Sequence, residues 1–140
     1  MLIRIIYVSQ AQSSLPIELK DILASSRKNN RPLGVTGAMG FLDGLYLQYL
    51  EGEASVVTAL YKRIEQDPRH SAVKILESKT IAERNFPGWS MGLLTWNDET
   101  KGIFQKFNPA GPFDLYAADK GTIDSLVRSW SASANWMALS

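Results

Sequence analysis

The chain has 140 residues, a formal net charge of +1 and no cysteine. Its length suits one domain with a hydrophobic core, and its Lys and Arg residues lack the concentration that nucleic-acid-binding proteins use. The lack of cysteine excludes disulfides, thiolate catalysis and cysteine-ligated metals. The sequence contains no apolar segment of about 18 residues, the length that a membrane-spanning helix needs. We therefore expect a cytoplasmic protein without nucleic-acid or membrane partners.

The N-terminal part begins with a predicted strand and a predicted helix. Residues 2–9, LIRIIYVS, are rich in β-branched residues and predict a strand. Alternation places four of its side chains on one face: Ile3, Ile5, Tyr7 and Ser9. Pro16 suits the first turn of a helix that we expect to run to about Lys28. The helix should stop within KNNRPLG, because the residue before a proline disfavours helical geometry.

A β-hairpin is the clearest local signal. Asp43-Gly44 lies between two alternating apolar runs, which is a strong mark of a two-residue turn and predicts strands over 35–42 and 45–51. The first of these strands has small residues at Gly37, Ala38 and Gly40. Small residues in a strand indicate that another group packs close to the backbone.

The order of the predicted elements indicates the fold class. Residues 53–67 predict a second helix, and residues 72–79 and 89–96 predict two further strands. The series is therefore typical of an α+β fold, the ferredoxin-like β-α-β-β-α-β arrangement plus an added strand, with a mixed sheet and two helices on one face. We assign residues 1–96 to this domain.

Residues 97–140 are expected to form a C-terminal helical extension of the same domain. A short helix near 103–107 would precede an amphipathic helix over 120–138, whose apolar residues recur at helical spacing. This extension would cover the open face of the sheet or offer its apolar side to a partner.

Common catalytic and metal-binding patterns are absent from the sequence. The single histidine, His70, is too few for a histidine-rich metal site, and no Walker A loop, dinucleotide-binding loop or nucleophile elbow occurs. Polar residues nevertheless fall at positions that should face the core, above all Tyr7, Gln48 and Asn30. A flat heterocycle with carbonyl and ring-nitrogen groups would satisfy both amides. Three further side chains could then meet a ribityl-phosphate tail: Arg63, Arg69 and His70.

Each of these residues also has an ordinary explanation when taken alone. Tyr7 could simply pack in the hydrophobic core or against a neighbouring strand, and Gln48 could face solvent. Asn29-Asn30 before a proline could be a simple turn. Arg63 and Asp67, four residues apart, could form a surface ion pair of little energetic value.

Taken in order, the motifs resemble those of BLUF domains, the small blue-light sensors that use flavin. The resemblance runs from Ile3 to about Thr95. The motifs that carry it are Tyr7 with Ser9, Asn29-Asn30 before Gly34-Val35-Thr36-Gly37, Leu47-Gln48-Tyr49-Leu50-Glu51-Gly52, Asp67-Pro68-Arg69-His70 and Phe86-Pro87-Gly88-Trp89-Ser90-Met91. Each motif is weak alone, but their order and spacing make the match specific.

The resemblance implies a flavin, FAD with FMN as the other candidate, between the two predicted helices. Tyr7 would donate an electron and a proton to the excited ring. Gln48 would bridge Tyr7 and the flavin, then rotate or tautomerise and bond the 4-carbonyl of the ring. The residues implied to hold the flavin are Ile22, Ser26, Asn29, Asn30, Gln48, Arg63, Asp67, Arg69 and His70. Trp89 and Met91 would pass the change outward.

The resemblance also implies a stand-alone photoreceptor that turns over no substrate and binds no metal. Its output would go through an unidentified downstream protein or a change of assembly, and we expect a homo-oligomer. Asn29 stands where some relatives have His or Lys. Tyr46 stands where an aromatic, often Phe, is usual, and it adds a second phenol near the ring.

Two alternative functions come from other classes. One is a ferredoxin-like hydrolase of the acylphosphatase type, although YVSQAQSS after the first strand lacks a phosphate-cradling glycine loop. The other is an interaction module that has kept the fold and lost its light response. The sequence leaves open the downstream partner, the choice between FAD and FMN, the lifetime of the lit state, and whether Trp89 or Met91 faces the flavin.

Overall fold

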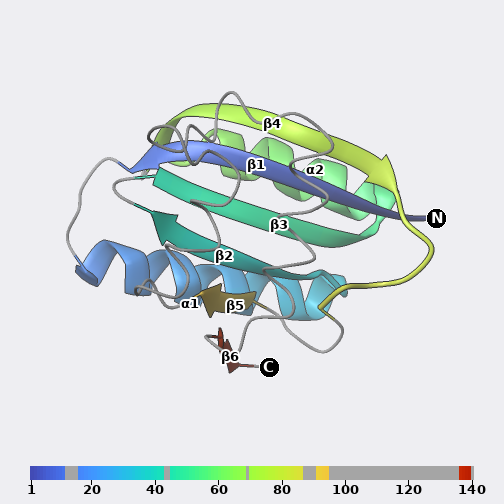
Figure 1. Cartoon of the computed structure of the whole chain (residues 1–140), viewed down its shortest axis with the longest axis horizontal. Coiled ribbons are helices and arrows are strands. Elements are labelled where there is room, and N and C mark those ends of the chain that lie inside the picture. The colour runs from blue at the N-terminus through green and yellow to red at the C-terminus, as the bar shows by residue number, and fades with distance from the viewer. Residues whose placement is uncertain (12–15, 43–44, 69, 87–90, 95–135, 140) are drawn as a thin grey trace, which may run out of the picture.

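The computed structural model describes residues 1–11, 16–42, 45–68, 70–86, 91–94 and 136–139 (Figure 1). Its elements are β1 (Leu2–Ala11), α1 (Pro16–Leu33), β2 (Thr36–Leu42), β3 (Leu45–Glu53), α2 (Ala54–Glu65), β4 (His70–Thr80), β5 (Met91–Leu94) and β6 (Trp136–Leu139). The strands form one six-stranded sheet in the order β4-β1-β3-β2-β5-β6. β5 pairs parallel with β2, while the other pairs are antiparallel. The predicted ferredoxin-like α+β fold with an added strand is confirmed.

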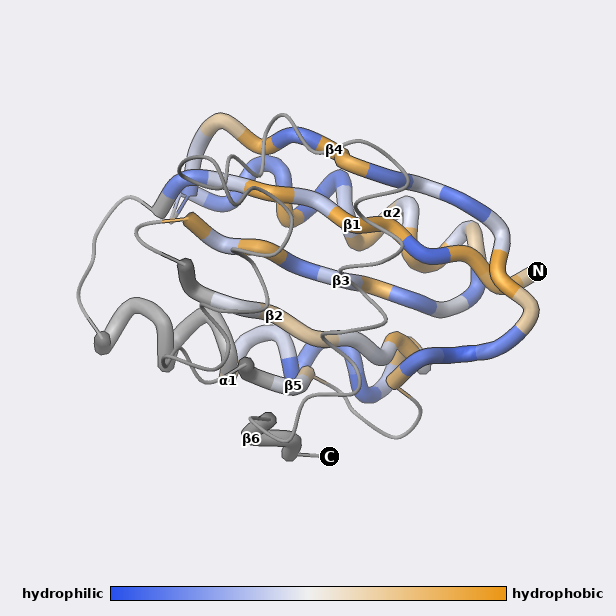
Figure 2. Tube along the Cα trace, in the orientation of Figure 1, coloured by the Kyte–Doolittle hydropathy of each residue, from blue (hydrophilic) through white to orange (hydrophobic). Residues whose placement is uncertain are grey.

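Both helices lie on the same face of the sheet (Figure 1). In Figure 2, hydrophobic colour dominates the middle of β1, and α2 alternates between hydrophobic and hydrophilic residues. The buried side of α2 carries Val57, Leu60 and Tyr61, which pack with the helix-facing side chains of β1 in one core cluster. The amphipathic pattern of α2 thus sets which of its side chains face the sheet.

The end of α1 differs from the sequence-based expectation. The helix continues past Lys28 to Leu33 and includes Pro32 in its last turn. It ends in a Schellman motif, in which Gly34 adopts a φ of 68° and the N–H groups of Gly34 and Val35 donate to the carbonyls of Arg31 and Asn30 at 3.3 and 3.1 Å. The prediction failed because a proline in a last turn forfeits only one backbone donor, whereas a left-handed glycine ends a helix decisively.

The β2–β3 hairpin is confirmed on both sides of Asp43-Gly44, two residues that lie outside the described part of the chain. Gly37 shows why one position of β2 has no side chain. A Cβ atom at Gly37 would lie 2.0 Å from the backbone oxygen of Tyr49 on β3. The backbone itself occupies the space that a side chain would need, so only glycine fits here.

The C-terminal helix predicted over 120–138 is wrong at its end. Trp136–Leu139 form β6, which pairs antiparallel with β5 from Met91↔Leu139 to Leu94↔Trp136. The apolar spacing suited a helix, but the open edge of β5 offers backbone hydrogen bonds that a short apolar segment also satisfies. Residues 120–135 and the helix expected near 103–107 lie outside the described residues. In the described part of the chain, no helix is long and apolar enough to cross a membrane.

Candidate functional site

Tyr7 and Gln48 form a buried pair on the central strands. They stand directly opposite each other in the β1–β3 register, and the hydroxyl of Tyr7 donates a hydrogen bond to Oε1 of Gln48. The side chain of Tyr7 is 0% exposed. Burial raises the pKa of its phenol well above the usual value, and nearby Tyr61 and Asp67 raise it further. Tyr7 is therefore a neutral donor, and the amide nitrogen of Gln48 is left to donate elsewhere.

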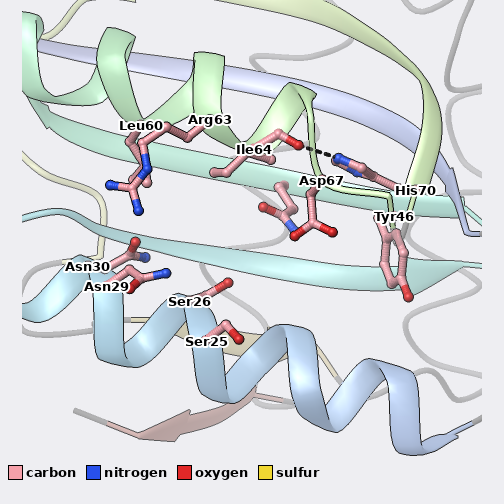
Figure 3. Close-up of a pocket in the computed structure, with 11 residues that line it drawn as sticks. Ser25, Ser26, Asn29, Asn30, Tyr46, Leu60, Arg63, Ile64, Asp67 and His70 are labelled. Atoms are coloured by element: carbon pink, nitrogen blue, oxygen red, sulfur yellow. Dashed lines mark hydrogen bonds between the residues drawn. The ribbon is translucent and has the colours of Figure 1, made fainter.

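A cavity of about 160 Å³ lies on the helix side of this pair (Figure 3). It is lined by Ser25, Ser26, Asn29, Asn30, Tyr46, Gln48, Leu60, Arg63, Ile64, Asp67 and His70. Amides and hydroxyls come mainly from α1, and apolar and charged groups come mainly from α2. Such a mixture suits a flat ring that has apolar faces and a hydrogen-bonding edge.

Helical spacing explains how the two helices supply this lining. On α1, Ser25 and Asn29 are four residues apart, as are Ser26 and Asn30, so these side chains form two rows on one side of the helix. Asn30 is only 2% exposed. In Figure 3, Arg63 of α2 reaches across the cavity toward the two asparagines of α1.

His70 is built into the cavity wall. Its Nε2 lies 2.6 Å from the backbone oxygen of Ile64, and its Nδ1 lies 2.9 Å from Oγ of Ser9. A carbonyl oxygen only accepts, so Nε2 carries the proton, and in the neutral ring Nδ1 accepts from the Ser9 hydroxyl. His70 thereby ties α2 to β1 and β4. Both ring nitrogens are engaged within the protein, and the contact of His70 with a ligand tail stays a prediction.

A second tyrosine touches Tyr7 from α2. The rings of Tyr7 and Tyr61 meet edge to face with their centroids 5.4 Å apart. The hydroxyl of Tyr61 donates to Oε2 of Glu65, one helical turn further along, at 3.4 Å. Burial and then the charge of Glu65 raise the pKa of the Tyr61 phenol. Tyr7 is thus held between an amide on its own sheet and an aromatic ring on the helix.

The first residue of β5 is hydrogen-bonded to α1, one of the two helices that line the cavity. Met91 is fully buried in the core cluster, and its backbone oxygen accepts a hydrogen bond from Nε of Arg27 at 3.2 Å. Burial lowers the pKa of Arg27, as does the like charge of Arg31 one turn away. Arg27 directly follows Ser26, so α1 contacts both the cavity and β5.

The segment that leads to β5 is tied to β3 on the opposite face of the sheet. Glu51, which is 0% exposed, accepts hydrogen bonds from the backbone N–H groups of Asn85 and Phe86 and from the hydroxyl of Thr36, each at 2.8 Å. Arg84 donates to the Thr36 hydroxyl at 2.8 Å. This buried carboxylate therefore determines where the chain passes before β5.

The structure brings together most of the site residues expected from the sequence. Ser26, Asn29, Asn30, Gln48, Arg63, Asp67 and His70 surround the cavity, and Tyr7 lies against Gln48. Arg69, Trp89 and the side chain of Ile22 lie outside the described residues. Three lining residues were not predicted from the sequence: Ser25, Leu60 and Ile64. Helical spacing could have identified them, because Ser25 is four residues from Asn29 and Leu60 is four residues from Ile64. No group of three or more His, Asp or Glu side chains in the described ranges could hold a metal ion.

Comparison with known proteins points to light sensing. A family model described as "Sensors of blue-light using FAD" matches residues 2–92. The chain is 34% identical over 91 residues to the photoactivated adenylate cyclase subunit beta of Euglena longa, which covers 64% of this chain and 11% of that protein. It is 32% identical over 112 residues to the blue light- and temperature-regulated antirepressor BluF of Escherichia coli (strain K12), covering 76% of this chain and 28% of that protein. It therefore spans only a small part of either relative.

A solved structure of similar length is also close in fold. The photo-activated state of BlsA superposes with a TM-score of 0.88 at 28% identity, over 96% of this chain and 98% of that chain. The likeness extends beyond the residues that the family model matches.

Proposed function

This chain belongs to the BLUF family of flavin-based blue-light sensors, and from that membership we propose that Tyr7 and Gln48 are its photochemical pair. The observation that carries the proposal is the hydrogen bond from the Tyr7 hydroxyl to Oε1 of Gln48. It joins a phenol that cannot ionise readily to an amide that lines the cavity. A buried phenol and a reorientable amide are suited to moving a proton without leaving a net charge in the core.

The cavity residues fit the flavin that the family uses. The amides of Asn30, Asn29 and Gln48 supply donors and acceptors for a ring edge that carries carbonyl and imide groups. Leu60 and Ile64 supply apolar surface for the ring face. Ser26, Arg63 and Asp67 would hold the remaining polar edge or the ribityl chain, together with Arg69, and Ile22 would pack beside the ring. His70 would keep the wall in place through Ser9 and Ile64.

The proposed cycle is an exchange of the two ends of the Gln48 amide. When bound, the flavin absorbs blue light and is an oxidant in its excited state. Tyr7 would supply an electron to it, and the phenolic proton of Tyr7 would move along the hydrogen bond toward Oε1 of Gln48. The electron and the proton would then return to Tyr7, and Gln48 would be left with its donor and acceptor ends exchanged by rotation or tautomerisation. In the exchanged state Gln48 would offer its amide N–H to the carbonyl edge of a bound flavin, which would shift the flavin absorption to the red.

Burial gives this exchange its energetic consequence. Gln48 is 4% exposed, so water cannot compensate a partner that the amide no longer satisfies. An unsatisfied buried donor or acceptor costs about 1–3 kcal/mol. A difference of about 1.4 kcal/mol already changes a two-state population by ten-fold.

The test is light-minus-dark infrared spectroscopy of the flavin-loaded protein. The proposal predicts a light-induced downshift of a flavin carbonyl band in the wild type, because a new hydrogen bond weakens that carbonyl. The Gln48→Leu variant, loaded with flavin and lacking an amide at this position, should lack the downshift. Retention of the band shift in Gln48→Leu would remove Gln48 from the mechanism.

We also propose FAD as the natural flavin, on the ground that the matching family description names FAD. Arg63 and Arg69 would meet its phosphates. Titration of the flavin-free protein with FAD, FMN and riboflavin tests this choice. Tighter binding of FAD than of FMN supports this choice. Equal affinities would show that the protein recognises only the flavin ring and the ribityl chain.

The light signal is proposed to leave through β5. Met91 belongs to the same core cluster as Tyr7, and its carbonyl accepts a hydrogen bond from Arg27 of α1. Trp89, two residues earlier, would share this role. Hydrogen exchange of β5 amides in the dark and in the light tests the route, and light-independent exchange would exclude it.

We propose that this chain is a sensor that turns over no substrate and acts on a separate partner protein or through a homo-oligomer. Within residues 97–140, the part of the extension that precedes β6 would pack against the face of the sheet opposite the helices. The supporting observation is that Ile6, Val8 and Leu47, which alternate with the helix-facing residues, are at most 1% exposed. Light scattering of the protein in the dark and under blue light tests the assembly. Affinity capture under both conditions tests for a partner.

A further inference from the structure

Tyr7 and Tyr61 differ in where an oxidised side chain could send its proton. Among the described residues, the hydroxyl of Tyr7 bonds to the amide oxygen of Gln48, which is a very weak base. The hydroxyl of Tyr61 bonds to the carboxylate of Glu65 at 3.4 Å. A phenol that loses an electron becomes strongly acidic. The oxidised state is therefore more stable on a tyrosine whose proton can pass to a carboxylate.

The two rings are in contact, which provides the path for an electron. Their centroids are 5.4 Å apart in an edge-to-face arrangement, and both rings belong to the same core cluster. Tyr46 also belongs to this core cluster and lines the cavity, and no ring contact between it and Tyr7 is seen in the described part of the chain. Tyr49 faces the opposite side of the sheet, where it contacts Phe86 and accepts from Asn85.

We propose that Tyr61 is a second redox-active residue, which takes over the oxidised state from Tyr7 while Glu65 takes its phenolic proton. The inference rests on the proposed role of Tyr7 as electron donor to the excited flavin. One electron passes from Tyr61 to the oxidised Tyr7, whose own proton is still shared with Gln48. Tyr7 thereby returns to a neutral phenol. The O–H bond of Tyr61 breaks, its proton joins the Glu65 carboxylate, and a neutral Tyr61 radical is left.

This transfer competes with the direct return of the electron to Tyr7. Once the proton sits on Glu65, the return must also bring the proton back, so the Tyr61 radical outlives the oxidised state of Tyr7. Glu65 is exposed to solvent. Tyr61 therefore holds the oxidising equivalent beside Glu65 until the electron and the proton return.

The test is electron paramagnetic resonance of flavin-loaded protein, illuminated with blue light and frozen, with absorption spectra recorded on the same samples. The wild type should show a tyrosyl radical that a nitroso spin trap places on Tyr61 by peptide mass spectrometry. Tyr61→Phe, which keeps the ring contact, should abolish that signal. Glu65→Gln should lower it by about ten-fold, the change expected when a hydrogen bond to a charged acceptor is lost. Tyr49→Phe, on the far face of the sheet, is the matched control and should retain the signal.

The outcomes separate this inference from the function on which it rests. The role of Tyr61 is overturned if the wild type shows no radical, or if the radical signal is unchanged in Tyr61→Phe. A normal red shift in the same samples would still support the Tyr7–Gln48 pair. A wild type that binds flavin and shows neither red shift nor radical overturns the photochemical role of Tyr7 and the inference with it. A signal that disappears in Tyr7→Phe as well as in Tyr61→Phe supports the proposed sequence of transfers.

Discussion

Tyr7 and Gln48 lie opposite each other on neighbouring antiparallel strands, with their side chains on the face that carries both helices. This relationship follows from the pairing register. A slip by one residue would turn Gln48 to the far face, where Tyr49 and Glu51 lie. The β2–β3 hairpin and the β1–β3 pairing together therefore place the amide between the phenol and the cavity.

Replacing Tyr7 by Phe should leave flavin bound and abolish the light-induced red shift, because the ring packing stays while the phenolic proton is lost. Absorption spectra before and after illumination measure this. Tyr49→Phe removes a buried hydroxyl of the same kind on the opposite face and should keep the shift. A normal shift in Tyr7→Phe would contradict the assignment and direct attention to Tyr46, the second phenol at the cavity.

Replacing Glu51 by Gln should lower the free energy of unfolding by about 1–3 kcal/mol. The NH₂ group of the new amide would face N–H and O–H donors that now bond to the carboxylate, so at least one of these hydrogen bonds would be lost. Urea denaturation measures this loss. Glu53→Gln is the control, because Glu53 pairs with the N-terminal amine while 57% exposed and should change stability by less than about 0.5 kcal/mol. Equal effects of the two substitutions would show that Glu51 does not anchor the segment before β5.

Replacing Gly37 by Ala should destabilise the fold by about 3 kcal/mol or more, because the new Cβ would meet a backbone oxygen of β3 at 2.0 Å. Gly52→Ala should cost about 1 kcal/mol, since its nearest neighbour, at 3.2 Å, is a methyl group of Val57 that can adjust. Thermal and urea unfolding compare the two variants. A mild effect at Gly37 would mean that β2 and β3 separate easily.

Stability should fall in alkaline solution. The pKa values of Tyr7 and Tyr61 are raised and that of Tyr49 is raised to about 12, in each case first by burial. An unfolded chain loses these protons near pH 10, so above that pH the folded state holds more protons than the unfolded state. The free energy of unfolding should therefore decline from about pH 10 upward, by up to about 1.4 kcal/mol per pH unit for each phenol.

Urea unfolding between about pH 9 and 12 measures this slope. Tyr49→Phe removes one of the three phenols and should make the decline less steep. An unchanged free energy of unfolding from pH 10 to about 11.5 would be inconsistent with these raised pKa values.

Local sequence signals predicted the elements whose determinants are themselves local. Asp43-Gly44 marked the hairpin, and alternation in LIRIIYVS put Tyr7 on the same face as Ile3 and Ile5. Helical spacing identified much of the cavity lining, including Ser26 with Asn30 and Arg63 with Asp67. These features depend on residues only a few positions apart, so a single sequence contains them.

Features that depend on distant partners were not predictable in the same way. The strand Trp136–Leu139 needs the edge of β5, and the apolar spacing alone favoured a helix. Both nitrogens of His70 are engaged by Ser9 and Ile64, a role that only the folded arrangement reveals. Glu51 looked like part of a strand motif, although its three hydrogen-bond donors come from β2 and from the segment after β4.

The most direct test of the account is an absorption spectrum of the flavin-loaded protein in the dark, under blue light and again in the dark. A small red shift of the flavin bands should form in the light and revert in the dark, because the Gln48 amide exchanges its ends and then returns. A protein that binds flavin and keeps an unshifted spectrum under illumination would contradict it.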